Sequence, residues 1–570
     1  MGESWHNFFY AAYDPAGTLL IDKPPLALWI QVASTKLFGF SGPSIIAPVA
    51  IAGTLAVPLV FAAGRRSHGV AAGLLAALVL AVYPESVATA RDSTMDAVMM
   101  MGLAAAGWLL VVAVEGKRPW LIVAWAALMG IVFNVKFFEG FIVLPAALLY
   151  IGWRFRDDWR PLVAPLAAAA AVGLVVSFAW VAAVELTPED SRPLVMNDKS
   201  NSELGLVFRY NGLERVLPGE VTVFAPFPGQ TGPSNVSNAF GVGDRGPLRL
   251  IQGSNGGLIG FGACLALGGV LVVLARRRDW LFEGPGLFWA AWLVTGVAFF
   301  SASNRAAAHY MESFAPALAV VAGVGLVEAW RARRRIASLR RDWDALIGPA
   351  VLLLLLAYGV RAHLDLDPIR TSAFVAIGIG ILATLAVVLG LRLPIPERLQ
   401  RQLFAIAIAA PIAVMLATSL WIALEAPPSG QITRPNPLIF AQGEPPPDVS
   451  PRVPAAAVLA HAEGVLDGAR YRFAVTSIND AGEAIAYTGA SILPIWNSYQ
   501  RVPVLAPEVL QQLVRDGEVP YVLVNRPLAS TGLLFELLLV MESECTPTRI
   551  DGVARTWQVW DCTPEANVSS

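Results

Sequence analysis

This sequence has unusually little charge. Of its 570 residues only 15% are Asp, Glu, Lys or Arg, whereas 56% are hydrophobic. A soluble globular protein carries about 25% charged residues, so a water-soluble fold of this length is excluded. The excess apolar surface has to contact lipid, and the composition therefore predicts a polytopic membrane protein. The net charge is −2 and no basic tail is present, so no nucleic-acid partner is expected.

Lysine and cysteine are scarce too. Only five of the 41 basic residues are lysine, a bias towards arginine that is typical of a GC-rich bacterial genome. Of the three cysteines, Cys264 lies inside an apolar run, where a thiol usually packs as a small hydrophobic side chain. Cys545 and Cys562 lie in a region expected outside the cytoplasm, where disulfides persist. We expect these two to form a disulfide, with two free thiols as the alternative.

Long apolar runs fill most of the first 425 residues. A helix that crosses a bilayer needs about 20 apolar residues, and twelve runs are candidates, two of them short. The predicted spans are 43–63, 70–90, 94–115, 119–134, 137–153, 161–183, 255–275, 286–302, 308–329, 345–361, 371–392 and 402–425.

Basic clusters fall in every second loop between these spans. Because cytoplasmic loops are enriched in Lys and Arg, the clustered loops are predicted to be cytoplasmic. Both termini and the intervening loops are then outside. The clusters are Arg65-Arg66, Lys117-Arg118, Arg154 to Arg160, Arg276 to Arg278, Arg331 to Arg341 and Arg392 to Arg401.

Three regions outside the spans are predicted to face the same, outer side. Residues 1–42 form a first loop whose apolar segment 26–32 is expected to lie in the membrane interface. The transmembrane domain, 43–425, contains a long outer loop at 184–254, rich in Gly, Pro and Asn, whose arginines are expected to be solvated.

The third outer region follows a Pro-rich linker at 426–450 and spans residues 451–570. Alternating strand and helix patterns predict a small extracytoplasmic α/β domain there. The strand patterns are 471–476, 520–524 and 555–560, and the helical patterns are 454–467, 507–516 and 531–542.

Four cations stand at the predicted outer boundary of the membrane: Lys23, Arg91, Lys136 and Arg305. A single cation in this position is usually a helix end whose charge reaches the headgroups. As a set, the four favour a cationic pocket for the phosphate of an anionic lipid.

Carboxylates accompany these cations. Asp22 directly precedes Lys23 in Asp22-Lys23-Pro24-Pro25, and Asp96 opens a span. At that position Asp96 could simply interact with the positive end of the helix dipole. A carboxylate can accept the proton of an attacking hydroxyl, and cations can stabilise a departing phosphate. The combination favours group transfer from a lipid phosphate.

Glu139 and Glu312 also lie close to outer boundaries, and His309 with Tyr310 stands at the outer mouth of the span 308–329. Ionisable groups at membrane depth are functional candidates. The alternative for His309 is a hydrogen-bonded packing residue.

Several segments resemble bacterial family 39 glycosyltransferases, relatives of protein O-mannosyltransferases and of the aminoarabinose transferase that modifies lipid A. The first loop carries the most specific match, and the long loop and the C-terminal domain contribute weaker ones. The matching segments are Ser4 to Tyr10, Tyr13-Asp14-Pro15, Asp22 to Leu26, Asn134-Val135-Lys136, Ser191-Arg192-Pro193, Tyr210-Asn211-Gly212, His309-Tyr310, Ala315-Pro316-Ala317 and Asp516 to Val524.

This resemblance implies a mainly α, polytopic membrane protein of the GT-C type with its α/β domain outside a bacterial plasma membrane. It implies an inverting transferase that moves a sugar from a polyprenyl-phosphate donor to a protein, lipid or glycan acceptor on the outer face. Carried over by position, Lys23 and Lys136 would hold the donor phosphate. Asp22 would lie at the site, with a divalent metal ion as a candidate cofactor.

The chain departs from the family pattern in three places. Ser93-Thr94-Met95 precedes Asp96 where relatives often have Asn-Asn-Pro, and no residue separates His309 from Tyr310. Relatives also carry a helix before the first loop and, just after it, the segment that usually supplies the catalytic base. Met1 falls inside that loop, so either the start is misassigned or the chain is a truncated copy. In a truncated copy, Asp14 or Asp22 would have to serve as the base.

Two other classes of protein compete with the transferase. A transporter or lipid flippase would show charged residues or Gly/Pro breaks in the middle of its spans, whereas here the ionisable residues gather at one predicted face. A non-catalytic scaffold, including an inactive truncated relative, would bind partners through its C-terminal domain and would need none of the outer cations.

Overall fold

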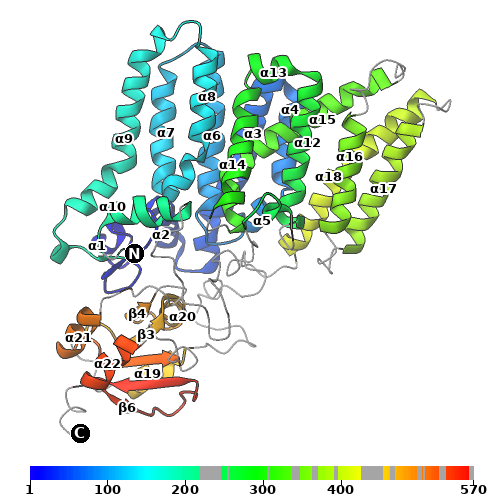
Figure 1. Cartoon of the computed structure of the whole chain (residues 1–570). Helices are drawn as coiled ribbons and strands as arrows, with labels where there is room; N and C mark the ends of the chain where they lie inside the picture. The colour runs from blue at the N-terminus through cyan, green and yellow to red at the C-terminus, as the bar shows by residue number, and fades with distance from the viewer. Residues whose placement is uncertain are drawn as a thin grey trace.

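The computed structural model describes residues 1–196, 198, 200–216, 245–252, 256–303, 307–336, 347–362, 370–389, 396–424, 453–462, 469–496, 504, 507–525 and 535–563. Long helices pack together in one body, and a smaller domain of strands and helices lies beneath one end of them (Figure 1). The predicted linker 426–450 and the candidate Arg305 lie outside the described residues.

The first half of the helical body begins with the short elements of the first loop. A capping box at Ser41 and Ser44 starts α3, in the reciprocal arrangement that satisfies free backbone N–H groups at a helix start. The elements are α1 (Trp5–Phe9), β1 (Leu19–Leu20), α2 (Leu26–Phe38), α3 (Gly42–His68), α4 (Val70–Ala81), α5 (Pro84–Ala90), α6 (Asp96–Glu115), α7 (Leu121–Lys136), η1 (Phe137–Val143), α8 (Leu144–Arg154), η2 (Arg160–Leu162) and α9 (Val163–Leu186).

The outer loop after α9 consists of short elements, and the second half of the body follows it. The elements are η3 (Glu189–Ser191), β2 (Leu194–Val195), α10 (Glu203–Gly205), η4 (Leu206–Tyr210), η5 (Leu213–Arg215), η7 (Arg249–Ile251), η8 (Gly256–Gly260), α12 (Phe261–Arg276), α13 (Arg278–Glu283), α14 (Gly286–Ala302), η9 (Ala308–Ser313), α15 (Ala315–Ile336), α16 (Ile347–Ala362), α17 (Arg370–Leu389) and α18 (Glu397–Leu424).

Seven helical segments of the described chain are long and apolar enough to cross a membrane, or eight if the bent pair α4 and α5 counts as one span. The bend of 59° falls at Pro84, because proline disfavours helical backbone in the residue before it. Each of the twelve predicted ranges contains a helix, but α14 and α16 are short and α8 has only 11 residues after the 3-10 turn η1. The number of spans therefore stays a prediction.

The C-terminal region forms the mixed α/β domain that the sequence predicts. Its five strands have the order β4-β3-β5-β7-β6, in which β3 is parallel to both β4 and β5, and β7 is antiparallel to β5 and β6. The elements are α19 (Ala455–His461), β3 (Phe473–Ser477), α20 (Ile478–Thr488), β4 (Ile492–Trp496), α21 (Pro507–Arg515), β5 (Tyr521–Asn525), α22 (Phe535–Glu544), β6 (Thr546–Thr548) and β7 (Trp557–Asp561).

The predicted disulfide between Cys545 and Cys562 is confirmed, with the two Cα atoms 4.2 Å apart. It joins the residue between α22 and β6 to the residue after β7, and so covalently links the edge strand β6 to its neighbour β7. Cys264, in α12, is a free thiol, as expected.

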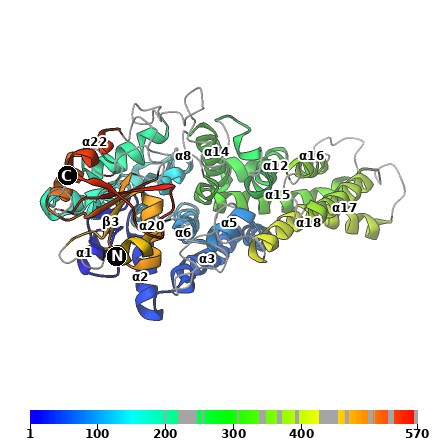
Figure 2. The same cartoon turned by 90° about the horizontal axis from the view of Figure 1, so that it is seen from below.

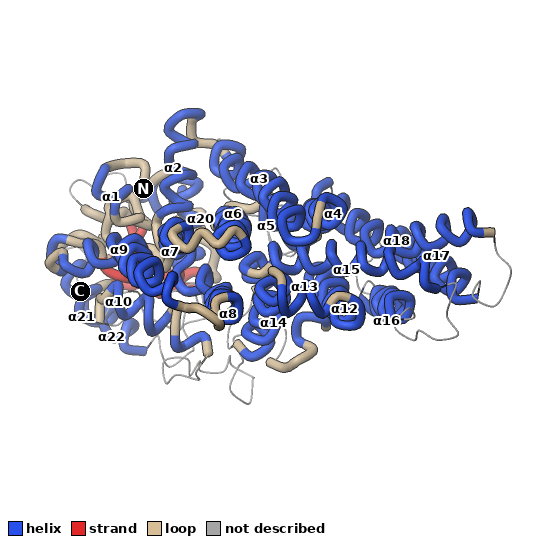
Figure 3. The backbone as a smooth tube through the Cα atoms, turned by 90° about the horizontal axis from the view of Figure 1, so that it is seen from above, coloured by secondary structure: helices blue, strands red, loops and turns tan. Residues whose placement is uncertain are grey.

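The two parts of the molecule meet at one half of the helical body. Seen from below, the C-terminal domain covers the half that contains α1, α2 and α8, whereas α16, α17 and α18 extend away from it (Figure 2). The view from above shows the same division (Figure 3). Residues of the helical body that lie near the C-terminal domain are therefore to be sought around α1 and α2 (Figure 2).

Candidate functional site

Lys136 ends α7 in a nearly closed environment, with 4% of its surface exposed. Its ammonium contacts the Asp96 carboxylate at the start of α6 and donates to Glu139 Oε1 at 2.9 Å. Phe137 follows with a positive φ of 47°, so α7 stops here and the 3-10 turn η1 brings Glu139 back to the lysine. A buried ammonium needs such partners, since an unpaired one costs several kcal/mol.

Tyr310 of η9 lies between two cations. Lys136 Nζ is 4.3 Å from the centre of its ring, and the Arg215 guanidinium carbon is 5.0 Å away. Arg215 also forms an ion pair with Glu139 Oε2 at 3.9 Å and donates to Asn211 Oδ1 at 3.0 Å. The outer loop thus delivers a buried arginine to the same place as the lysine of α7.

Asp22 and Lys23 follow β1 and lie on the other side of this loop segment. Lys23 Nζ is 3.1 Å from Asp22 Oδ2 and 6.0 Å from the ring centre of Tyr210. Asn211 Nδ2 donates to the Asp22 carbonyl at 3.2 Å. Burial disfavours the charged carboxylate, but Lys23 and Arg215 outweigh this effect and hold the pKa of Asp22 below its ordinary value.

The structure brings Asp22, Lys23, Asp96 and Lys136 together as two ion pairs. Residues 210–215 connect the pairs, because Tyr210 and Asn211 contact the first pair and Arg215 reaches Tyr310 and Glu139 beside the second. His309 lies edge-on to Tyr310, and the charges of both lysines act on it. We call the following residues together the cation site: Asp22, Lys23, Asp96, Lys136, Glu139, Tyr210, Asn211, Arg215, His309 and Tyr310.

Other predicted candidates lie elsewhere. The carboxylate of Asp14 accepts hydrogen bonds from Thr18 N, Thr18 Oγ1 and Leu19 N, each at 2.9 Å, and so holds a turn of the first loop. Arg91 ends α5 and donates to the Ile422 carbonyl of α18. Glu312 is fully buried and accepts from Ser86 Oγ at 2.8 Å.

The expectation that arginines of the long outer loop are solvated is wrong for three of them. Arg192, Arg215 and Arg249 are at most 9% exposed. Arg192 and Arg249 donate to backbone carbonyls, which replace water as acceptors. Arg215 is therefore a site residue that the sequence reading missed, although Tyr210-Asn211-Gly212, just before it, was recognised as a motif.

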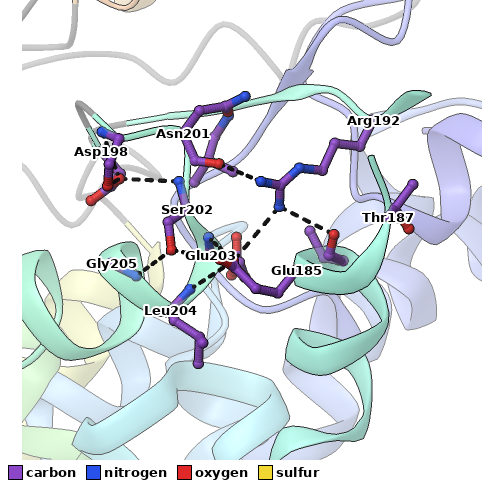
Figure 4. A network of polar contacts seen from close by, with 12 residues as sticks. Glu185, Thr187, Arg192, Asp198, Asn201, Ser202, Glu203, Leu204 and Gly205 are labelled. Carbon is purple, nitrogen blue, oxygen red and sulfur yellow. Dashed lines mark hydrogen bonds and ion pairs between the residues drawn. The ribbon is translucent and has the colours of Figure 1, made fainter. Parts of the chain in front are cut away.

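A polar network fixes the loop that carries Arg215 (Figure 4). Glu185, near the end of α9, accepts from Ser202 Oγ at 2.9 Å and from Glu203 N at 2.7 Å, and forms an ion pair with Arg192 at 3.6 Å. Asp198 accepts from Ser202 N at 3.1 Å and pairs with Arg209. Together they hold the start of α10 and hence the direction of the following turn.

Glu203 is the unusual member of this network. Its carboxyl is fully buried and has no hydrogen-bond partner among the described residues. Burial, together with the charge of Glu185, raises its pKa to about 8. The side chain is therefore expected to carry a proton at neutral pH.

A metal ion at Asp22 finds no support in the described residues. None of them form a group of three or more His, Cys, Asp or Glu side chains that could hold a metal ion. Asp22 itself is already paired with Lys23.

Comparisons with known proteins show what the chain is similar to in sequence and in fold. Residues 22–182 match the sequence model of the family described as "Dolichyl-phosphate-mannose-protein mannosyltransferase". Two relatives come from Bacillus subtilis (strain 168). "Putative mannosyltransferase YycA" is 28% identical over 612 residues, covering 92% of this chain and 86% of the relative. "Putative mannosyltransferase YkcB" is 26% identical over 623 residues, covering 92% and 84%.

Among solved structures, the crystal structure of ArnT from Cupriavidus metallidurans in the apo state is similar over nearly the whole length. The TM-score is 0.50 at 18% sequence identity, covering 99% of this chain and 93% of that chain. At this identity the likeness concerns the fold, and function has to be argued from the site. The predicted GT-C fold with a C-terminal domain is confirmed.

Proposed function

We propose that this chain transfers a sugar from a polyprenyl-phosphate donor to an acceptor hydroxyl, a proposal supported by the match of residues 22–182 to the model of the family described as "Dolichyl-phosphate-mannose-protein mannosyltransferase". The observation that supports this most is the cation site. Lys23 lies near the ring of Tyr210, and Lys136 and Arg215 both face the ring of Tyr310.

Three cations in one place suit a phosphate. Charge-assisted hydrogen bonds from lysine and arginine to phosphate oxygens are short and strong, and the planar guanidinium can bind two oxygens at once. The apolar helices beside the site would accommodate the polyprenyl chain. Arg91 is proposed only as a peripheral contributor, since it already donates to the Ile422 carbonyl.

The proposed reaction is a single displacement. The acceptor oxygen bonds to the anomeric carbon from the face opposite the phosphate, while the bond between that carbon and the phosphate oxygen breaks. The polyprenyl phosphate leaves with the electron pair, and the configuration at the anomeric carbon inverts. The cations stabilise the charge that develops on the leaving phosphate.

Asp22 is the better candidate for the base that receives the hydroxyl proton. Its side chain is 21% exposed, whereas the Asp96 side chain is 2% exposed and lies against Lys136. Lys23 and Arg215 keep Asp22 ionised, so it can accept a proton although it is a weak base. Asp96 then acts as a positioning residue that holds Lys136.

We propose that the site faces the outside of a bacterial plasma membrane. The basic turns support this orientation. Trp280 of α13 donates to the Ser67 carbonyl beside Arg66, and α13 lies at the end of the body opposite the C-terminal domain (Figure 1). Membrane-impermeant labelling of single cysteines at Arg66, Lys117, Arg278 and Arg335 should report the cytoplasm, and labelling from outside at any two would contradict this orientation.

The test of function uses the purified full chain in lipid nanodiscs. Polyprenyl phosphate should bind, and a polyprenyl-phosphate-linked mannose should release polyprenyl phosphate when an acceptor is supplied from bacterial membranes. Lys23→Met should weaken the binding strongly and reduce the release of polyprenyl phosphate to the same extent. Lys36→Met, the same change at an exposed lysine of α2, is the matched control. Binding without any cleavage of the donor, together with its movement across vesicle membranes, would favour a flippase instead.

A further inference from the structure

The two residues of β1 face opposite parts of the molecule. Leu19 is fully buried in the core of the C-terminal domain, in the cluster that contains Tyr471 and Leu493. Leu20 is fully buried among residues of the helical body, including Phe133 and Trp180. Alternate residues of a strand point to opposite sides, so this short strand pins the first loop to both parts at once.

Two tyrosines add polar contacts between the first loop and the C-terminal domain. Tyr13 Oη donates to the Ile478 carbonyl at 2.6 Å. The Tyr471 hydroxyl contacts Thr18 Oγ1, and Thr18 Oγ1 lies 2.9 Å from Asp14 Oδ2. Since the Thr18 proton goes to the carboxylate, Tyr471 is the donor, and a continuous relay links the domain to the turn at Asp14.

Tyr13 occupies a distinctive place on the C-terminal domain. Ile478 follows the last residue of β3, and the parallel strands β4 and β5 lie on either side of β3. The carboxyl ends of such strands, where the strand order reverses, are where an open parallel sheet ordinarily takes a ligand. Here the first loop contacts this edge, and β3, β4 and α20 lie at the end of the domain nearest the N-terminus (Figure 1).

Leu20, the last residue of β1, lies two positions before Asp22 and three before Lys23. β1 also pairs with β2 of the outer loop, with Leu19 opposite Leu194 and Leu20 opposite Val195. The direction in which Lys23 leaves β1 is therefore set by the C-terminal domain as well as by the helical body. We infer that the C-terminal domain is a positioning element of the donor-phosphate site, which acts on Lys23 through Tyr13, Leu19 and Tyr471; this inference rests on the proposed function.

The test measures the dissociation constant of polyprenyl phosphate for the purified full chain. Tyr471→Phe removes the hydroxyl that donates to Thr18, and we expect binding about threefold to tenfold weaker, as for the loss of one neutral hydrogen bond. Tyr13→Phe is a second, independent variant and should weaken binding to a similar extent. The matched control is Tyr521→Phe in the same domain, whose ring packs against His461, and it should bind as the wild type does.

A purely structural role is separated from positioning by a double-mutant cycle. If Tyr471 acts through Lys23, Tyr471→Phe should have no further effect on the residual binding of the Lys23→Met variant. Equal losses in both backgrounds, or unchanged binding in Tyr471→Phe and Tyr13→Phe alike, would overturn the inference. A wild-type chain that does not bind polyprenyl phosphate would instead refute the proposed function.

Discussion

Replacing Lys136 by methionine tests the most buried part of the cation site. The substitution removes the ammonium and leaves Asp96 and Glu139 facing each other without it. Breaking a buried ion pair by removing one partner costs about 3–5 kcal/mol. Glu139 would still be paired with Arg215 at 3.9 Å, and Asp96 would still interact with the positive end of the dipole of α6. We therefore expect a cost near the lower end of this range, about 3 kcal/mol.

A second substitution makes the prediction sharper. Replacing both members of a buried ion pair by neutral groups of similar size is often neutral or stabilising. The double variant Asp96→Asn/Lys136→Met should therefore be more stable than Lys136→Met alone. Chemical or thermal unfolding of the purified proteins in one detergent gives the order, with the exposed Lys36→Met as the control, expected within about 0.5 kcal/mol of the wild type. A Lys136→Met variant as stable as this control would refute the reasoning.

The same pair of variants distinguishes two roles of Lys136. If its ammonium binds the donor phosphate, both the single and the double variant lose affinity for polyprenyl phosphate. If the ammonium only neutralises the buried charge of the Asp96 carboxylate, the double variant recovers both binding and stability. Stability and binding measured side by side therefore separate a ligand contact from a structural ion pair.

Three further predictions address other parts of the chain. Arg215→Lys keeps the charge but loses the planar fork, and we expect about tenfold to hundredfold weaker binding of polyprenyl phosphate; unchanged affinity would exclude a bidentate contact. Because the pKa of Glu203 is raised to about 8 from its ordinary value of 4.5, the native state retains a proton that the unfolded state releases. Stability should fall between about pH 4.5 and 8 by at most about 1.4 kcal/mol per pH unit, and Glu203→Gln should flatten this dependence in pH-dependent unfolding. Replacing Cys545 and Cys562 by serine should cost about 3 kcal/mol in the unfolding of the C-terminal domain, and a midpoint unaffected by the change would contradict that role.

The regular parts of the structure could be read from the sequence because they depend on local patterns. Apolar length predicts where each long helix of the body lies, and the strands β3, β5 and β7 fall within three residues of their predicted ranges. The strand β4 was missed because Pro494 sits in its middle, and a proline argues against a central strand. In the sheet, β4 is an edge strand, where a missing N–H can face solvent.

The buried arginines show a different limit. Arg192 and Arg215 are charged residues in a loop rich in Gly, Pro and Asn, a composition typical of solvated segments. Their burial depends on acceptors far along the chain, such as Glu139 for Arg215. No local pattern contains that information, whereas the Tyr210-Asn211-Gly212 motif marked the segment without showing what it carries.

The sequence predicted the depth in the membrane at which the residues of the candidate site lie, but not which of them face one another. Arg91 and Lys136 stand at the same predicted depth, yet Lys136 faces Asp96 and Tyr310 whereas Arg91 faces the Ile422 carbonyl of α18. Position along a span gives the height of a side chain, and which neighbour it meets depends on how the helices pack around it. The contact between the Lys23 and Lys136 ion pairs is made by residues 210–215, which come from neither segment. For a membrane site of this kind, the sequence therefore predicts the height of each side chain in the membrane, whereas only the fold shows which neighbour that side chain faces. A loop residue such as Arg215 joins the site only if the fold brings it to both the right height and the right neighbours.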